Sequence, residues 1–357
     1  MSKKPLILGI ETSCDETAAS IISENDQGNP IVLANIVSSQ EDVHKQFGGV
    51  VPELAARSHI EKIDWIVKKA IDNSGIKINE LDAIASTAGP GLIVCLSVGL
   101  SFGKALAASL KKPFIAVNHL EGHALSPMLN SKLNYPYLLL LISGGHSQYL
   151  GVKNLSEYKR LGTTIDDAIG EAFDKTAKLL GIEFPGGPQI EVLAKKGDPN
   201  KYNLPKPIFN KGGCNLSFAG LKTAILKISK EIKNDQEKFN LAASFQKTII
   251  EILQKKTKIA FTEFERQIKP KEKKFVVAGG VAANKEIRGM LIKICKEANY
   301  EPIFPSIELC GDNAAMIAMV GLEKFKLKQF DKLDYPAKPR WPLDENAAFL
   351  KGAGVKL

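Results

Sequence analysis

The chain has 357 residues and a formal net charge of +9. This length exceeds the roughly 100–200 residues typical of one domain, so we expect two lobes. With 44% hydrophobic and 24% charged residues, the composition is that of a globular protein and argues against intrinsic disorder. The positive balance favours a polyanionic partner, although only five of the 48 basic residues are arginines and such a bias can have other origins.

The sequence shows no targeting or membrane signal. The apolar run from Leu6 to Ile10 ends at Glu11 and is too short for a signal peptide. No run approaches the 18 or so apolar residues of a membrane span. The five cysteines form no CxxC pair and no even framework, which is typical of thiols in a reducing compartment. We therefore expect a cytoplasmic protein without a membrane partner.

Residues 1–130 predict an N-terminal α/β lobe. Apolar runs at 6–10 and 18–23 flank a polar segment, which predicts a β-hairpin with a hydroxyl-rich turn. Apolar residues recur at helical spacing from Pro52 to Asn73, which predicts an amphipathic helix that ends near Gly75.

A strand–helix–strand unit completes this lobe. Buried strands are expected at 83–87 and 114–118, and the helix between them, 93–110, is crowded with glycine, alanine and serine. Small residues indicate close packing against another helix or a protein interface, while Lys104 argues against a helix that spans a membrane.

Residues 131–330 repeat this order of elements and predict a C-terminal α/β lobe. Strands at 137–142 and 148–152 form a second hairpin, and a strand that ends at Ala278 leads through two glycines into a helix that begins near Ala283. We therefore expect two related lobes around a cleft.

Three further segments have less regular patterns. The last helix, about 312–328, is expected to pack back on the first lobe. Residues 197–213 are rich in Pro, Lys and Asn and predict a loop, and residues 331–357 predict an extended tail.

Two histidines four residues apart predict a metal site. His119 and His123 lie about 40° apart around a helix, so both imidazoles face one ion. In the HExxH pattern the glutamate follows the first histidine directly, but here Glu121 lies about 200° around the helix and points away. The alternative is a pair of ordinary polar helix residues. His44 and His59 lack such a partner and are expected to be surface or structural residues.

The histidine pair needs a further ligand. Asp312 at the start of an apolar helix offers a carboxylate, but an aspartate in this position is also typical of an N-terminal helix cap. The residues alone leave both roles open.

Glycine turns in the second lobe offer main-chain N–H groups to an anion. They are Ser143–His146 between two strands, Gly279–Asn284 between a strand and a helix, and a third tight turn at Pro185–Pro188. Each turn alone is a weak signal. The chain has no GxxxxGK[ST] loop and no GxGxxG after a strand, which argues against a P-loop and a Rossmann cofactor site.

An acidic helix is expected over 166–180. Asp167, Glu171 and Asp174 occupy one stripe of it, and a solvated face is the usual explanation. The alternative is a carboxylate that holds a sugar hydroxyl or a cation.

The motifs, in this order, resemble the tRNA N6-adenosine threonylcarbamoyltransferases, once described as glycoproteases. The match runs from about residue 6 to 342. It rests on seven segments: Gly9–Thr17, Gly48–Ala55, Thr87–Leu92, His119–His123, Ser143–His146, Asp166–Leu180 and Ala278–Asn284. The resemblance implies an α/β, two-lobed fold of the actin/Hsp70/sugar-kinase type, with nucleotide and metal between the lobes.

The resemblance also implies site residues. By motif position, His119, His123 and Asp312 would bind one divalent metal, iron(II) or else zinc. A turn rich in hydroxyl and carboxyl groups, with Ser13, Asp15 and Glu16, is a further candidate for a binding turn near the phosphate of the nucleotide. Threonylcarbamoyl-adenylate would be bound by residues of the second lobe: Leu141, Ile142, Ser143, Gly144, Gly145, Asp174, Gly187, Glu191 and Asn284.

The implied activity is transfer of a threonylcarbamoyl group to N6 of the adenosine 3′ to the anticodon in tRNAs that read ANN codons, with release of AMP. No residue is assigned as a general base. The implied partners, besides tRNA, are a paralogous non-catalytic subunit and a small P-loop ATPase. The helices at 52–73 and 93–110 are candidate contacts for that subunit.

Three alternative functions follow from the same residues. A metallopeptidase would use the histidine pair, but Glu121 is on the wrong face for it. A small-molecule kinase of the same fold would not use a His–His–Asp metal set. A non-catalytic scaffold is disfavoured because every proposed ligand is present.

Overall fold

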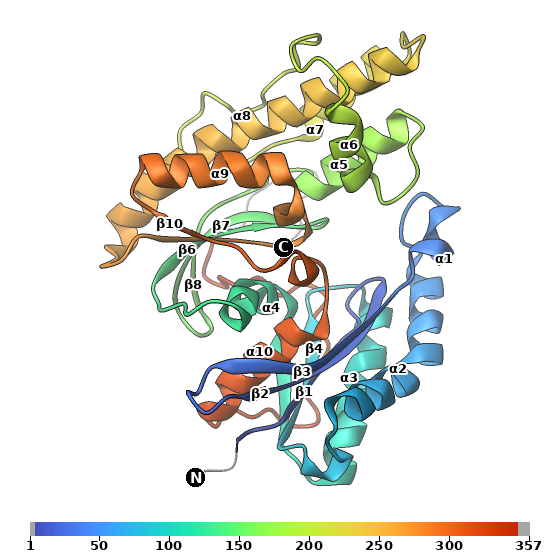
Figure 1. Ribbon diagram of the computed structural model, residues 1–357, viewed down its shortest axis with the longest axis vertical. Coiled ribbons are helices and arrows are strands. Elements are labelled where there is room, and N and C mark those ends of the chain that lie inside the picture. Colours follow the sequence, from blue (N-terminus) through green and yellow to red (C-terminus); the bar gives the residue numbers. More distant parts are fainter. Residues whose placement is uncertain (1–3, 349–357) are drawn as a thin grey trace. The chain divides into compact units, whose positions relative to one another are not determined.

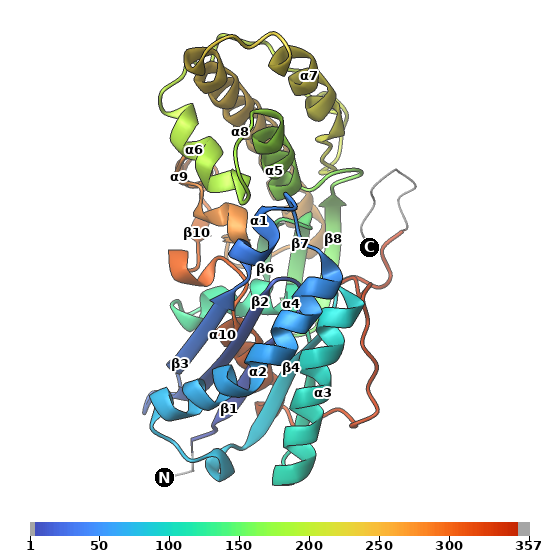
Figure 2. The same ribbon diagram turned by 90° about the vertical axis from the view of Figure 1, so that its right-hand side faces the viewer.

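The computed structural model describes residues 4–348 (Figures 1 and 2). The chain forms two compact units. Within the described residues, unit 1 comprises residues 4–133 and Pro305–Glu345, and unit 2 comprises Asn134–Phe304 and residues 346–348. The expected C-terminal tail, 331–357, is thus described only as far as residue 348, and residues 349–357 lie outside the described part.

Unit 1 is built on a five-stranded sheet with the order β3-β2-β1-β4-β5. The first three strands are antiparallel, which confirms the predicted hairpin, with Ile7 opposite Ile22. The last two strands run parallel to β1 and are buried along their whole length, as continuous apolar runs require. The strands are β1 (Ile7–Glu11), β2 (Glu16–Glu24), β3 (Pro30–Ser39), β4 (Ala83–Gly89) and β5 (Phe114–Asn118).

Helices cover both faces of this sheet. Leu8 and Ile10 of β1 point into the core that helix α2 lines, whereas a Cβ on Gly9 would lie 2.4 Å from the carbonyl oxygen of Ala314, on helix α10. Because neighbouring residues of a strand face opposite sides, α2 and α10 pack on opposite faces. The helices are α1 (Glu41–Lys45), α2 (Pro52–Ser74), α3 (Ile93–Leu110), α4 (His119–Leu125) and α10 (Ala314–Lys326), with short 3-10 turns at Ile78–Glu80, Ser126–Leu129 and Ile307–Leu309.

The predicted ends of these helices are confirmed where local chemistry fixes them. Helix α2 starts with Pro52 in its first turn and ends at Gly75, whose φ of 72° is left-handed. Among the described residues, α3 is long and apolar enough to cross a membrane by length and composition, with a mean hydropathy of 1.8. Core helices of soluble proteins meet the same criterion, and α3 packs against β4 and α2. The expectation that no segment approaches this length and hydropathy is therefore wrong for α3.

The chain after α10 runs back along unit 1 without helix or strand. The N–H of Asp331 donates to the carbonyl of Phe114, and the N–H of Lys338 donates to that of Ala88. Gly89 has a φ of 146°, and a Cβ on it would collide with the carbonyl of Lys338. The segment after α10 therefore packs against β4 and β5, at Ala88, Gly89 and Phe114.

Unit 2 repeats the sheet of unit 1, with the order β10-β9-β6-β7-β8. Strands β6, β7 and β8 form an antiparallel meander, and β9 and β10 run parallel to β6. This confirms the predicted second hairpin and the repeated order of elements. The strands are β6 (Tyr137–Ile142), β7 (Ser147–Asn154), β8 (Glu157–Thr163), β9 (Lys274–Ala278) and β10 (Glu301–Ile303).

The helices of unit 2 correct two expectations. The acidic helix starts at Ile169, so Asp167 lies in the loop before it and is not part of a helical stripe. The predicted tight turn at 185–188 is the first turn of a helix, because Pro185 takes the N-cap position and the chain continues helically to Ala194. The helices are α5 (Ile169–Leu179), α6 (Gly186–Ala194), α7 (Ala219–Ser229), α8 (Asp235–Ile268) and α9 (Lys285–Glu297), with a 3-10 turn at Gly280–Ala283.

The segment between α6 and α7, residues 195–218, contains no helix and no strand. The loop predicted at 197–213 is therefore confirmed.

Candidate metal centre and nucleotide-binding turns

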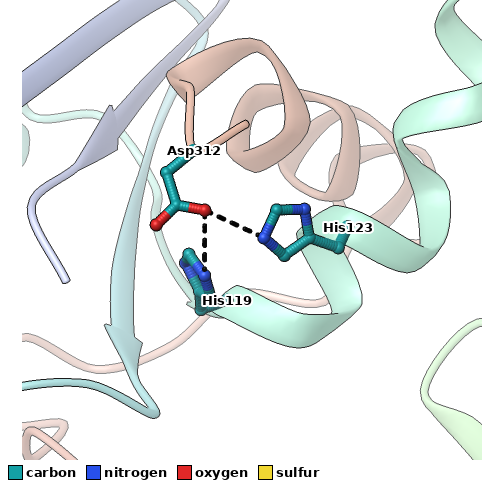
Figure 3. A group of neighbouring side chains, drawn as sticks. All are labelled: His119, His123 and Asp312. Atoms are coloured by element: carbon teal, nitrogen blue, oxygen red, sulfur yellow. Dashed lines mark hydrogen bonds and ion pairs between the residues drawn. The ribbon is translucent and has the colours of Figure 1, made fainter. Parts of the chain in front are cut away.

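The two histidines and Asp312 come together in unit 1 (Figure 3). Nε2 of His123 lies 3.0 Å from Oδ1 of Asp312, and Nε2 of His119 lies 3.5 Å from the same oxygen. One ligand atom from each residue can be chosen so that all three lie within 4.8 Å of one another. The side chain of His123 is fully buried and that of Asp312 is 24% exposed, so the group is accessible from the Asp312 side.

Local structure explains why the histidines face one point. Helix α4 begins directly after β5, and Asn118 caps it, with Oδ1 accepting from the N–H groups of Leu120 and Glu121. His119 and His123 are then one helical turn apart, as the spacing predicts. Asp312 does not cap α10, because Asn313 takes that position and accepts from the N–H of Met316. The alternative role of Asp312 as a helix cap is therefore wrong.

Glu11, at the end of β1, fixes the orientation of His119. Its Oε2 lies 3.1 Å from Nδ1 of His119, so a proton on Nδ1 leaves the lone pair of Nε2 on the side of Asp312. Glu11 is held in turn by the Ser13 N–H (2.5 Å) and the Thr87 hydroxyl (2.5 Å), and it is 1% exposed. A carboxylate behind a ligating histidine is a common second partner in metal sites.

The charges around this group favour a cation. Burial alone would lower the pKa of His119, but the carboxylates of Asp312 and Glu11 outweigh it and raise this pKa to about 9. Burial, followed by the nearby Asp312 and Asp15 carboxylates, raises the pKa of Glu16 well above its ordinary range. Two imidazole nitrogens and a carboxylate, with the Glu11 carboxylate beside His119, therefore fit a divalent transition metal.

The turn with Ser13, Asp15 and Glu16 belongs to the same surroundings. The hydroxyl of Ser13 lies 3.1 Å from Nδ1 of His119. Because the turn brings carboxylates toward Asp312, it would repel a phosphate unless a cation lay between them.

Glu121 does not face the group. It is buried, and its carboxylate lies 3.4 Å from Nζ of Lys324 on α10. The position of Glu121 on the helix predicts that its side chain points away from the two histidines. The structure confirms this and shows that the side chain points into the protein core.

His44 and His59 were predicted to be either surface or structural residues. Both are buried, so the prediction of surface residues is wrong and that of structural residues is confirmed. Nδ1 of His59 lies 2.8 Å from the hydroxyl of Thr17, and Nε2 lies 3.0 Å from the carbonyl of Cys14. His59 therefore ties α2 to the β1–β2 turn.

In unit 2, a series of hydrogen bonds links the segments that carry the predicted nucleotide-binding residues, starting from the β6–β7 turn. Leu141 and Ile142 end the buried strand β6, and the turn closes with the Ser143 N–H donating to the carbonyl of His146 at 2.8 Å. Gly170, in the first turn of α5, donates its N–H to the carbonyl of Ser143. A Cβ on Gly170 would lie 2.7 Å from Cα of Gly144, so only glycine allows this approach.

Side chains connect two further helix N-termini, that of α6 to α5 and that of α9 to α6. Oδ1 of Asp174 accepts from the N–H of Gly186, the first residue of α6 (2.9 Å). Oε1 of Glu191, on α6, accepts from the N–H of Lys285, the first residue of α9 (3.1 Å). Gly187 lies in the first turn of α6.

Asn284 caps α9. Its Oδ1 accepts from the N–H of Ile287 at 3.0 Å, and its Nδ2 donates to Gln246 at 3.1 Å. Hydrogen bonds thus link the N-termini of α5, α6 and α9 in series to the β6–β7 turn. Helix N-termini in general favour anions.

The acidic residues around α5 are paired. Nζ of Lys175 lies 2.7 Å from Asp167 and 3.0 Å from Glu171. Asp166 accepts from the N–H groups of Phe218 and Ala219 at the start of α7. Of the expected acidic stripe, Asp174 is the residue whose side chain contacts a helix N-terminus, that of α6.

Residue spacing missed Glu11 as a partner of His119. Its position at the end of a buried strand, in a segment that is otherwise apolar, was an available signal, because a carboxylate there must find a partner.

Comparison with known proteins shows the family of the chain. The family model for tRNA N6-adenosine threonylcarbamoyltransferase matches residues 31–319. The protein is 79% identical over 357 residues to the tRNA N6-adenosine threonylcarbamoyltransferase of Pelagibacter ubique (strain HTCC1062), with 100% of each chain covered. It is 52% identical over 342 residues to the protein of the same name from Rickettsia rickettsii (strain Sheila Smith), covering 95% of this chain and 98% of that one.

A solved structure confirms the expected fold class, the actin/Hsp70/sugar-kinase type. HypF from T. kodakarensis is similar with a TM-score of 0.60 and 15% identity. The likeness covers 91% of this chain and 48% of that chain, so the chain spans about half the length of that protein, and it shows the fold alone. From the family model and the two relatives, the chain belongs to the tRNA N6-adenosine threonylcarbamoyltransferase family.

Proposed function

We propose that the protein transfers the threonylcarbamoyl group of threonylcarbamoyl-adenylate to N6 of the adenosine 3′ to the anticodon (position 37) in tRNAs that read ANN codons. The N6 amine attacks the carbamoyl carbon, the bond from this carbon to the phosphate oxygen breaks, and AMP leaves with the electron pair while N6 loses a proton. The observation that carries the proposal is the convergence of His119, His123 and Asp312 in a chain whose whole length matches the family.

One divalent ion would be held by His119, His123 and Asp312, with Glu11 orienting the first of them. Two histidines and a carboxylate are typical of iron(II) sites and also occur at zinc sites, so we propose iron(II), with zinc as the alternative. When bound, such an ion supplies Lewis acidity and a template for the threonylcarbamoyl group.

The adenylate would be bound by unit 2. Its phosphate would accept from the main-chain N–H groups of Gly144 and Gly145, in the turn that Ser143 closes, and from the N-terminus of α6 at Gly187. Asp174 and Glu191 would hold the helix N-termini in place, and Asn284 would fix the start of α9. No side chain is needed as a general base if positioning and electrostatic stabilisation supply most of the rate.

An unpaired anticodon-loop base can be presented without melting a duplex, which suits a tRNA substrate. We also propose that the protein acts in the cytoplasm, in line with the expectation from the sequence.

A paralogous non-catalytic subunit and a small P-loop ATPase are proposed as partners. The outer surfaces of α2 and α3 suit a contact with the first of these. Ile60 is 64% exposed, Ile93 48% and Val94 43%, and the exposed positions Ser97 and Ser101 allow close approach of another helix.

The alternative functions are not favoured by the structure. A metallopeptidase needs a base beside the metal, and Glu121 is buried against Lys324. No observation of the described residues favours a small-molecule kinase or a scaffold over the transferase.

The test is transfer of label from threonine-derived threonylcarbamoyl-adenylate to unmodified tRNA, measured for the full chain with and without the proposed partners. Metal content is measured on the same samples. The wild-type protein should label tRNA, and His119→Ala should bind no metal and label none. Full activity of the His119→Ala protein would exclude this function for the site.

A further inference from the structure

The positive charge of the chain is concentrated in one segment of unit 2. Residues 195–258 contain 14 lysines and five aspartates or glutamates, and this difference of 14 − 5 = +9 equals the net charge of the whole chain. The rest of the chain is balanced, with 34 basic and 34 acidic side chains. The basic excess therefore has a definite place in the fold.

Part of this charge gathers where the 195–218 loop meets α8. Nζ of Lys206 lies 5.4 Å and Nζ of Lys255 lies 4.1 Å from the ring centroid of Phe209. Two ammonium groups thus share one aromatic ring, which orders their flexible side chains. We define the basic loop surface as Lys206, Phe209, Lys211, Lys247 and Lys255.

The loop is fixed to α8 by lysines although it has no helix or strand. Lys256 is fully buried, and its ammonium donates to the carbonyls of Lys211 (2.8 Å) and Gly213 (3.2 Å). Lys247 donates to Asn200, and Lys255 donates to Asn210. These bonds hold the loop in one conformation before any ligand arrives, which lowers the entropy cost of binding.

The basic loop surface has little compensating negative charge. Among the described residues, Glu251 is the one carboxylate in an ion pair with it, bonded to Lys206 and 3.8 Å from Lys247. An open pocket of about 490 Å³ includes Lys206 and is lined by both polar and apolar residues: Asn203, Leu204, Pro205, Lys206, Phe209 and Asn210.

We infer that the basic loop surface binds phosphates of the tRNA substrate, outside the site where the adenylate is bound. Lysine contacts to phosphates position an RNA without reading its sequence, and they suit an enzyme that acts on several tRNAs. Four lysines with one carboxylate match a ligand with closely spaced negative charges. The inference rests on the proposed function, which makes the polyanion a tRNA.

The test compares two double variants of the full chain that remove the same charge. Lys206→Ala/Lys255→Ala changes the basic loop surface, and Lys293→Ala/Lys296→Ala changes exposed residues of α9, outside it. The dissociation constant of fluorescently labelled, unmodified tRNA is measured by anisotropy at several salt concentrations. The first variant should bind on the order of tenfold more weakly at physiological salt, with a salt slope reduced by about one to two. The control should bind like wild type.

A second measurement keeps the inference testable if the first variant is destabilised. In the wild-type protein, bound tRNA should protect Lys206, Lys247 and Lys255 from acetylation, as read by mass spectrometry, and should leave Lys293 reactive. Equal tRNA binding by the two variants, or equal acetylation with and without tRNA, would overturn the inference while leaving the transfer reaction intact. Wild-type protein that binds no tRNA would instead contradict the proposed function. Protection by an acidic protein but not by tRNA would assign the surface to a protein partner and overturn the RNA assignment.

Discussion

The candidate sites of units 1 and 2 are built from different parts of the chain. In unit 1, the functional atoms belong to side chains, and a buried carboxylate, Glu11, orients one of them. In unit 2, the proposed ligand groups are mostly main-chain N–H groups, and side chains such as Asp174 and Glu191 hold the helix N-termini that present them. Removal of one side chain should therefore abolish the first site, whereas the second should respond mainly to changes of backbone conformation.

The largest expected effect is the loss of a metal ligand. His123→Ala should abolish metal binding and transfer to tRNA, because Asp312 and His119 alone leave the ion weakly held. Metal content of the purified variant and its transfer activity are the measurements. Retention of stoichiometric metal would show that the three residues are not the ligand set.

A smaller effect is expected for the residue behind the ligand. Glu11→Gln should weaken metal affinity by about 10–100-fold, because a carboxamide fixes the tautomer of His119 less strongly than a carboxylate. Affinity can be measured by calorimetric titration with cobalt(II) or zinc(II). The matched control is Glu121→Gln, which neutralises a carboxylate paired with Lys324 and should leave metal affinity unchanged. Equal affinity of the Glu11→Gln and wild-type proteins would remove the positioning role.

In unit 2, neighbouring glycines should respond differently to the same substitution. Gly279 has a φ of 96°, and a Cβ on it would lie 2.4 Å from the carbonyl oxygen of Ile142, so Gly279→Ala should cost about 1–3 kcal/mol and weaken adenylate binding. A Cβ on Gly280 would meet nothing within 4 Å, so Gly280→Ala is the control and should be nearly neutral in stability. Chemical denaturation and binding of a non-hydrolysable adenylate analogue are the measurements. Equal stability of the two variants would contradict the backbone explanation.

The smallest expected effect concerns the pH dependence of stability. Burial lowers the pKa of His59 below its ordinary value of 6.5. As pH falls below about 6.5, the unfolded chain gains this proton before the folded one, so the free energy of unfolding should fall by up to about 1.4 kcal/mol per pH unit until the folded-state pKa is reached. His59→Gln should remove this contribution. Parallel pH profiles of the two proteins, measured by denaturant unfolding, would contradict it.

Local sequence determined most of the elements and the shared direction of the two histidines. The spacing of His119 and His123 placed both imidazoles on one side of α4, and Gly75 ended α2, because both effects act within a few residues. The repeated strand order was also visible, since buried strands are continuous apolar runs. Where prediction failed, as at Asp167 and the 185–188 segment, the first N–H of the helix bonds to a residue elsewhere in the chain. Ile169 donates to Ser147, and Gly186 donates to Asp174.

Only the tertiary structure decided which residues meet. Asp312 is 189 residues from His123 in sequence, and spacing alone could not bring the two together. The structure excludes the role of helix cap, because Asn313 caps α10, and places Asp312 beside both histidines. Glu11 reaches His119 because β1 and β5 lie on either side of β4 in one sheet and end near each other. The periodicity of apolar residues predicts secondary structure because it depends on contacts within a few residues. The candidate metal centre depends instead on packing between residues far apart in the chain, which local sequence patterns do not reveal.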